Sequence, residues 1–351
     1  NNSLFKYAMG KRIYFFIFIS IILLLFFCSV LVCFATGTSG AIVVKETSGA
    51  RPLGMGEAFV ALADDVNALN FNPAGLAQIN DYEISVMYLD SLVDTWFGFI
   101  GYAHPLGGKV ERKAGRRVKS VKMRENRATI GLGISILQAG NMVLDPEGKS
   151  VRAEEDYLAN LGFGYIIWRS AERAENRRRG AIATGQLRNE ISLGVGLKFV
   201  HSTLVEKYSA MAYAADIGVL GSFIVGKNRF LLGICGQNLG TKIKFEEEGD
   251  ALPLTVRAGA SYQMDFGQEH KLTITGEGIK PNDADFKGSG GAEYWYREIF
   301  ALRAGYKAGY DLDTFTCGAG FVWENFQIDY GWGMSGTKMG DNHRISLTGR
   351  F

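Results

Sequence analysis

Proline and cysteine are scarce in this chain, with 6 and 4 residues among 351. So few prolines exclude a proline-rich repeat, and the glycines show no Gly-X-Y period of the collagen type. The cysteines form no CxxC pair and the histidines no HExxH motif, so the sequence predicts no metal site and no cofactor. A charge of one sign is also missing: 38 basic and 36 acidic residues give a net charge of +2. This balance argues against a nucleic acid as partner.

Long apolar runs are confined to the first 34 residues. Basic residues precede an uncharged apolar run at 13–34, and small residues follow it at 35–41. A positive start, an apolar middle and a small-residue exit are typical of a secretory signal peptide. We therefore expect a signal peptide over 1–35, with cleavage after Ala35 or Ala41. The alternative is a permanent anchor, because the run is long enough to span a bilayer.

Glycine is abundant instead, with 45 residues, and aromatic residues make up 12% of the chain. Average proteins contain roughly 7% glycine. The excess indicates many tight turns and many positions that require a small side chain. Cys235 and Cys317 both lie in apolar, strand-like runs, so we expect two separate buried thiols rather than one disulfide. An exported, glycine-rich chain without further helical spans is either a secreted β-protein or a transmembrane β-barrel.

Alternation of apolar and small polar residues dominates the rest of the chain. In 190–199, for example, Ile191, Leu193 and Val195 share one face, and the opposite face carries mainly glycine and serine with two charges. A soluble sandwich would place bulky charges on its solvent face. Small polar residues suit a crowded barrel lumen, and a continuous apolar face suits lipid. Strands of about ten residues match a tilted membrane strand. The sequence predicts an all-β protein, a transmembrane antiparallel barrel over 81–351; the alternative is a periplasmic sandwich.

The alternation marks fourteen candidate strands. They lie near 83–89, 95–104, 128–138, 156–169, 189–201, 212–225, 229–236, 254–264, 271–280, 291–296, 299–306, 314–322, 325–331 and 343–351. An even number places both ends of the barrel segment on one side, the periplasmic side of an outer membrane. Connections after even strands should then be short.

Two connections, 105–127 and 170–188, break this rule because they are long, and both are basic. Docking to an acidic periplasmic partner or an anionic surface is one interpretation, and a solvated, mobile loop is the other. The docking interpretation rests on Arg116, Arg117, Arg177, Arg178 and Arg179. The aromatic Phe351 closes the last strand in phase with its apolar face. It resembles the C-terminal signal that outer-membrane barrels present to their assembly machinery.

The segment 36–80 precedes the first strand. Met55, Phe59, Leu62, Val66 and Leu69 recur at helical spacing, so we expect one helical face there, ended by a turn at 72–75. A segment this short must pack on something, and the free surface is the inside of the barrel. Two adjacent acids at 64–65 are interpreted as a cap or a solvated turn, with a cation site as the alternative.

The run ARPLGMGEAFVALADDVNALNFNPAGLAQ resembles the N-terminal signature of PorV/PorQ-type outer-membrane proteins, within the wider FadL-like group. In that group the N-terminus forms a hatch inside a fourteen-stranded barrel. Glu57 departs from the pattern, since another small residue is expected there. The resemblance implies that the hatch includes Arg51, Gly54, Gly56, Asp64, Asp65, Asn72, Pro73 and Gly75.

Three functions remain open. PorV-like members bind secreted cargo proteins and secretion components of a type IX system and shuttle cargo at the outer membrane. FadL-like members transport hydrophobic small molecules such as long-chain fatty acids. A structural protein or surface antigen is the third. The sequence has no GxxxxGK[ST] or GxSxG motif, and the GxGxxG match at 331–336 has no helix pattern after it, so we expect no enzyme. An outer-membrane hydrolase is the alternative.

Overall fold

The computed structural model describes residues 41–91, 95–112, 121–125, 127–143, 150–170, 188–245, 249–267, 269–310, 314–334 and 341–351. The described residues belong to one compact unit, 37–351. The helical elements are short: η1 (Ile42–Val44), α2 (Ala50–Gly54), α3 (Ala68–Phe71) and η2 (Pro73–Gln78). None of these described helices is long and apolar enough to cross a membrane.

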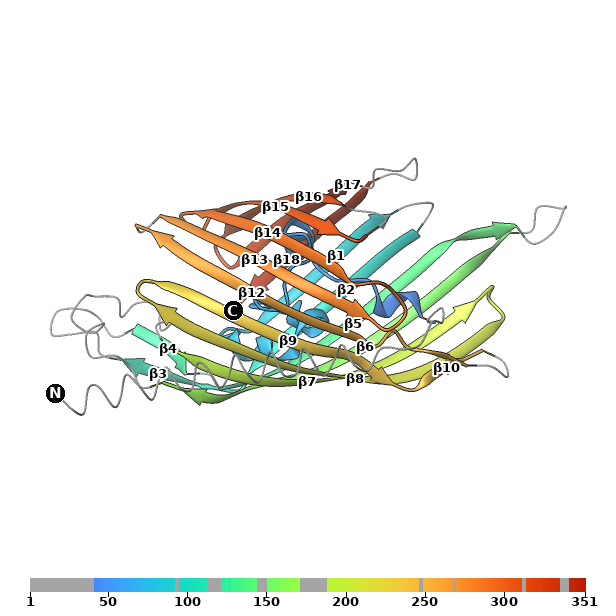
Figure 1. The fold of residues 1–351 in the computed structure, drawn as a ribbon, viewed down its shortest axis with the longest axis horizontal. Helices are drawn as coiled ribbons and strands as arrows, with labels where there is room; N and C mark the ends of the chain where they lie inside the picture. The colour runs from blue at the N-terminus through green and yellow to red at the C-terminus, as the bar shows by residue number, and fades with distance from the viewer. Residues whose placement is uncertain are drawn as a thin grey trace. The chain divides into compact units, whose positions relative to one another are not determined.

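Fourteen antiparallel strands form a closed barrel (Figure 1). Their bounds are β1 (Glu83–Ser91), β2 (Thr95–Pro105), β5 (Ala128–Val143), β6 (Ser150–Arg169), β7 (Glu190–Leu204), β8 (Tyr208–Val225), β9 (Asn228–Gly240), β12 (Thr255–Phe266), β13 (His270–Pro281), β14 (Lys287–Tyr296), β15 (Phe300–Ala308), β16 (Phe315–Trp323), β17 (Phe326–Met334) and β18 (Asn342–Arg350). Neighbours in sequence pair with each other, and β1 closes the ring on β18 with Glu83 opposite Arg350. The predicted fold class is confirmed.

The two ends of the barrel differ in the parts of the chain that they carry. We call the end where β1 begins and β18 ends the terminal end. The opposite end, the hairpin end, carries a small hairpin of β10 (Lys242–Lys244) and β11 (Gly249–Ala251). A second hairpin, β3 (Gly108–Arg112) with β4 (Val121–Glu125), occupies part of the long basic connection 105–127. The other basic connection lies mostly outside the described residues.

Several strands are longer than predicted, mainly toward the hairpin end. The alternation predicted a strand from 156, but β6 begins at Ser150. Charged residues interrupt the apolar pattern at 154–156, yet the backbone there still pairs with both β5 and β7. Backbone hydrogen bonds to two neighbours therefore extend the strand where the side-chain pattern has ended.

The two faces of the wall follow the predicted alternation. On β7, Leu193, Val195 and Leu197 are exposed on the outer face, whereas Ser192 and Lys198 are buried on the inner face. The outer face is therefore an apolar surface suited to lipid, and the inner face is small and polar. One prediction was wrong: Cys235 is buried but Cys317 is exposed, because it lies in phase with the outward residues of β16.

Residues 41–80 lie inside the ring of strands, drawn in blue and cyan in Figure 1, and we call this segment the hatch. The predicted single helical face was wrong. Met55, Phe59 and Leu62 are buried, but 55–67 is a series of turns between α2 and α3. Gly56 and Glu57 have left-handed φ values of 66° and 59°, which no α-helix accommodates. A segment surrounded by wall is buried on all sides, so its apolar spacing does not report one face.

Candidate functional site

The hatch sits against the wall at positions where the strands carry glycine. A Cβ atom on Gly164 would lie 2.7 Å from the Ala77 nitrogen, and one on Gly331 would lie 2.5 Å from the Ala50 oxygen. On Gly194 it would collide with the backbone of Ala74. Real Cβ atoms do not approach backbone atoms this closely. Part of the glycine excess therefore makes room for the hatch backbone.

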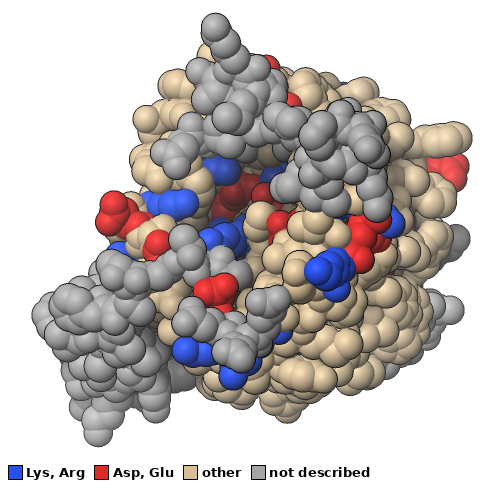
Figure 2. Space-filling model, turned by 90° about the vertical axis from the view of Figure 1, so that its right-hand side faces the viewer, with Lys and Arg blue, Asp and Glu red and all other residues tan. Residues whose placement is uncertain are grey.

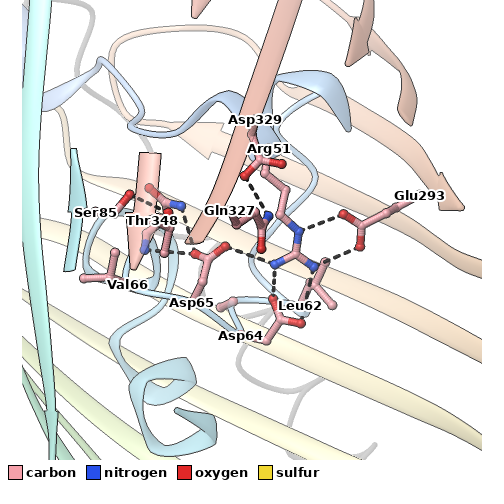
Figure 3. A network of polar contacts seen from close by, with 12 residues as sticks. Arg51, Leu62, Asp64, Asp65, Val66, Ser85, Glu293, Gln327, Asp329 and Thr348 are labelled. Carbon is pink, nitrogen blue, oxygen red and sulfur yellow. Dashed lines mark hydrogen bonds and ion pairs between the residues drawn. The ribbon is translucent and has the colours of Figure 1, made fainter. Parts of the chain in front are cut away.

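Arg51, on α2, ties the hatch to itself and to the wall (Figure 3). Its Nε and Nη2 donate to the two carboxylate oxygens of Glu293 on β14, at 2.8 and 2.9 Å. Its Nη1 donates to Asp64 Oδ1 at 2.7 Å and to Asp65 Oδ2 at 3.0 Å. We call Arg51, Asp64, Asp65 and Glu293 the Arg51 cluster. The guanidinium group thus links α2, the turn at 64–65 and strand β14 at a single point.

The cluster continues into the wall. Arg303 on β15 donates from Nε to Glu293 at 2.7 Å and from Nη1 to Asp329 on β17 at 2.8 Å. Gln327 also donates to Asp329, at 2.7 Å. Arg303, Glu293 and Asp329 are buried. Buried charges are tolerated when they are paired and hydrogen-bonded, and this chain of pairs supplies both.

The surroundings of Asp65 in the hatch disfavour its ionised form. Burial raises its pKa to about 6, Arg51 opposes the rise, and the nearby carboxylates of Glu83 and Asp64 add to it. Its Oδ1 accepts hydrogen bonds from the backbone and side-chain nitrogens of Asn67 at 3.0 and 2.9 Å. Asp65 thus accepts a backbone N–H just ahead of α3, as a capping acid does, but the interpretation of 64–65 as a solvated turn was wrong, because Asp65 is buried and both acids bind Arg51.

Glu57, the departure from the family pattern, forms a second ionic anchor. Burial alone would raise the pKa of Glu57, but Lys307 and Arg344 hold it well below its usual range. Lys307 Nζ donates to Glu57 Oε2 at 2.9 Å, and Arg344 Nη1 lies 3.2 Å from Oε1. Thr47 donates to the same carboxylate. A large acid at this position therefore binds β15 and β18.

The wall also satisfies the backbone of the hatch. Glu277 on β13 accepts hydrogen bonds from the backbone nitrogens of Phe59 and Val60, both at 2.9 Å, and from Arg257 on β12. Thr275 on the same strand donates to Ala58 O at 2.9 Å. These contacts supply partners for backbone groups that a helix would have paired within itself.

The remaining predicted hatch residues have packing and turn roles. Asn72 accepts from the Ala74 nitrogen at 3.1 Å and donates to Val60 O and to the wall at Val219 O, while Pro73 begins η2. Gly56 N donates to Thr316 on β16 at 3.0 Å. Gly54 packs on Gly318, and a Cβ on Gly75 would collide with Ala63 O.

The charged wall residues that take part in these contacts were not predicted from the sequence. They are Arg257, Glu277, Glu293, Arg303, Lys307 and Arg344. A signal existed, because each lies in phase with the small, inward-facing positions of its strand. A charge inside a narrow lumen needs a partner, and the hatch is the available one.

A cavity of about 140 Å³ opens between the hatch and the wall at the hairpin end. Figure 2 looks onto this end, where basic and acidic side chains gather in and around a hollow. Its lining includes apolar Val44, Leu158 and Ile279 and the aromatic Tyr310. It is also rich in charge, with the basic residues Lys45, Lys198, Arg257 and Lys287 and the acidic residues Glu46, Glu57 and Asp283. Lys287 Nζ lies 4.4 Å from the centroid of the Tyr310 ring, and the ion pairs of the described residues include none for Lys287.

The other predicted sites are placed as follows. Phe351 N donates to Tyr82 O at 2.9 Å beside the start of β1, and its ring contacts Phe326. Arg116, Arg117, Arg177, Arg178 and Arg179 lie outside the described residues. Within the described ranges, no group of three or more His, Cys, Asp and Glu side chains could hold a metal ion.

No family model matches this sequence, and no curated protein matches it. Among solved structures, the toluene transporter TodX of Pseudomonas putida aligns with a TM-score of 0.50 at 11% identity, over 86% of this chain and 96% of TodX. A FadL homologue of Pseudomonas aeruginosa aligns at 0.44 and 10%, over 87% and 98%. CdiB of Acinetobacter baumannii aligns at 0.42 and 14%, over 77% of this chain and 60% of CdiB, less than two thirds of its length. The match to TodX shows that the two chains share the fold of a closed β-barrel.

Proposed function

We propose that the protein is an outer-membrane channel of a diderm bacterium that passes small hydrophobic molecules, with the hatch as its internal barrier. The observation that carries this is the cavity between hatch and wall at the hairpin end, in a barrel that shares its fold with a toluene transporter. In this proposal the hairpin end faces outward and the terminal end faces the periplasm. The protein is a carrier of solutes and not an enzyme.

The cavity size indicates the size of the solute. Its volume is about 140 Å³, close to the roughly 150 Å³ apolar cavity that binds one benzene molecule. A single ring or a short chain fits such a space, whereas a long acyl chain exceeds it. The proposal therefore favours one-ring solutes over the long-chain fatty acids that FadL-like members also carry.

The lining indicates the polarity of the solute. Val44, Leu158 and Ile279 offer apolar contact, and Lys287 offers a positive charge without an ion-pair partner among the described residues. A solute with an apolar ring and one acidic group would place its ring on the apolar residues and its acid on Lys287, whereas most of the other charged lining residues are already paired with one another or with the wall. A charge-assisted hydrogen bond of this kind contributes about 1.5–3 kcal/mol.

Equilibrium binding of benzoate and toluene to the purified barrel tests this proposal. We expect saturable binding of benzoate, weakened about tenfold or more by Lys287→Gln because the charge-assisted bond is lost. Toluene binding should be little affected by that substitution. Ile279→Trp should abolish binding of both by filling the cavity. Lys227→Gln, in an exposed turn at the other end, is the matched control. Absence of saturable binding for both solutes would exclude the proposal.

A second candidate, the PorV/PorQ-like protein shuttle, is favoured by the hatch signature ARPLGMGEAFVALADDVNALNFNPAGLAQ. It predicts that secretion components or cargo proteins co-purify with the barrel from detergent-solubilised outer membrane. Mass spectrometry of the partners distinguishes the two candidates, because a solute channel needs no such proteins. In either case an N-terminal signal peptide, cleaved after Ala35 or Ala41, and recognition of Phe351 by the assembly machinery form part of the proposal.

A further inference from the structure

Among the residues that the structure describes, two carboxylates at the hairpin end have no basic partner. Glu154 and Asp156 lie in phase on the inner side of β6 and contact each other, and Asp156 is fully buried. The ion pairs of the described residues include none for either acid, and the adjacent Arg152 binds Glu155 and Glu206 instead. Asp156 Oδ1 is buried without a hydrogen-bond partner. His201 on β7 is the nearby titratable group, and its ring lies on the outer face beside Tyr157.

The leading turn of the hatch lies directly on these acids. The backbone nitrogen of Val43 donates to Asp156 Oδ2 at 3.3 Å, and the backbone N–H of Ile42 contacts the Glu154 carboxylate. Val43 is fully buried. Two successive N–H groups thus point at two carboxylates. Asp156 is buried, and Glu154 beside it is half-buried. Neutral donors compensate two adjacent carboxylates only in part, so a positive charge at this point would stabilise the ionised form of both.

Cleavage of the peptide bond between Ala41 and Ile42 would create such a charge, the ammonium group of a new N-terminus. The sequence Ser39-Gly40-Ala41 places small residues at the positions that a signal peptidase reads. Ala41 has a left-handed φ of 64°, which an alanine rarely adopts. Cleavage after Ala41 removes one of the backbone hydrogen bonds described for this turn. That bond runs from Val44 N to Ala41 O and is 3.4 Å long.

We propose that the mature chain begins at Ile42 and that its α-ammonium group is the cation of the Glu154–Asp156 pair. Hydrolysis of the Ala41–Ile42 peptide bond by a signal peptidase consumes one water. The new carboxylate leaves on Ala41 with the leader, and the amine stays on Ile42, where it is protonated near neutral pH. Removal of the leader during export then supplies the charge that fixes the first turn of the hatch once the barrel closes. Cleavage after Ala35 would leave residues 36–41 ahead of the site and no ammonium group at Ile42.

N-terminal sequencing and intact mass of the protein purified from outer membranes give the first test. We expect Ile42 as the first residue. An amine-reactive reagent should label its α-amino group at least about tenfold more slowly in the folded barrel than in the boiled protein, because the ion pair with the two carboxylates holds the amine in its protonated, unreactive form. A first residue other than Ile42, or equal labelling in both states, would overturn the proposal.

Substitutions of the two acids test the pairing itself. Glu154→Gln and Asp156→Asn should each speed labelling of the Ile42 amine and lower the temperature at which the folded band is lost on gels. Glu155→Gln, on the same strand but paired with Arg152, is the matched control and should change neither. Should one of these variants fail to fold, the other variant and the wild-type labelling still decide. Labelling that is as slow in both single variants as in the wild type would refute the pairing.

Discussion

At the scale of residues, ion pairs tie the hatch to the wall in addition to its apolar contacts. Arg51 alone meets three carboxylates, and Glu57 meets two basic residues from different strands. Each of these groups is largely removed from water, so each depends on its partners for stabilisation. Loss of one partner therefore costs more than the loss of a surface pair, which water compensates.

Arg51→Met tests this dependence. It leaves Asp64, Asp65 and Glu293 facing one another without their common cation. Breaking a buried pair costs about 3–5 kcal/mol, so the variant should lose its folded gel band at a clearly lower temperature. Arg297→Met, which removes an exposed pair with Glu269, should behave like the wild type. Equal thermal stability of the two variants would contradict the role given to the Arg51 cluster.

Asp65 predicts a pH dependence. Folding raises the pKa of Asp65 to about 6, so the native state holds the proton more tightly than the unfolded chain does. The resulting stabilisation is complete below about pH 4, the range of an ordinary aspartate, and is lost as the pH rises through 6. Asp65→Asn does not titrate.

We therefore expect the difference in thermal stability between pH 4 and pH 7 to be smaller in Asp65→Asn than in the wild type. Thermal midpoints at a series of pH values measure it. Asp265→Asn, an exposed acid at the terminal end of β12, serves as control and should keep the wild-type profile. Identical profiles for Asp65→Asn and the wild type would mean that Asp65 does not titrate in this range.

At the scale of elements, the strands and the hatch fit together through glycine. At several positions where the hatch backbone lies closest to the wall, the strand residue is glycine, and the hatch turns occupy the space that the missing side chain leaves. The strands thus provide the shape of the site as well as its charges. Such close backbone approach explains why glycine alternates with apolar residues along β6 and β7.

Gly194→Ala should displace the turn at Asn72–Gly75, because the added methyl group would overlap the Ala74 backbone. The expected result is faster cleavage of the hatch by a protease added to the purified barrel. Gly276→Ala is the matched control, since the nearest atom to its Cβ, Ser289 O, is 4.0 Å away. Equal cleavage rates in the two variants would show that the wall tolerates a methyl group at Gly194.

The barrel strands were predictable from the sequence because their period of two is a local property. Leu193, Val195 and Leu197 reveal their face without knowledge of any partner. The hatch was harder to predict. The backbone of Phe59 and Val60 is satisfied by Glu277, more than 200 residues away, so no local pattern marks those turns. Arg51 was named as a hatch residue, but its partner Glu293 was visible only as one acid among small inward residues.

At the scale of the whole molecule, closure of the ring decides the behaviour of the barrel. All fourteen strands have two neighbours, and β1 pairs with β18 over eight residue pairs from Glu83 to Asp90. A closed ring leaves no strand edge to solvent or lipid. Denaturation must therefore break the ring before any strand can leave it.

Closed barrels resist dodecyl sulfate until they are heated. We expect the unboiled protein to migrate differently from the boiled protein on a gel, with one sharp transition as the incubation temperature rises. Deletion of β18 removes the closing partner of β1 and should abolish this difference. Identical mobility of boiled and unboiled full-length protein would argue against a closed ring.

The position of the hatch in the chain fixes the timing of its docking. Ala50 binds Ser346 on β18, and Arg51 binds Glu293 on β14, so a segment made early contacts strands made last. Such contacts between distant parts of a chain form late, because the intervening loop must close first. Docking of the hatch is therefore the last step in the folding of the barrel. A docked hatch shows that the strands it contacts have already paired.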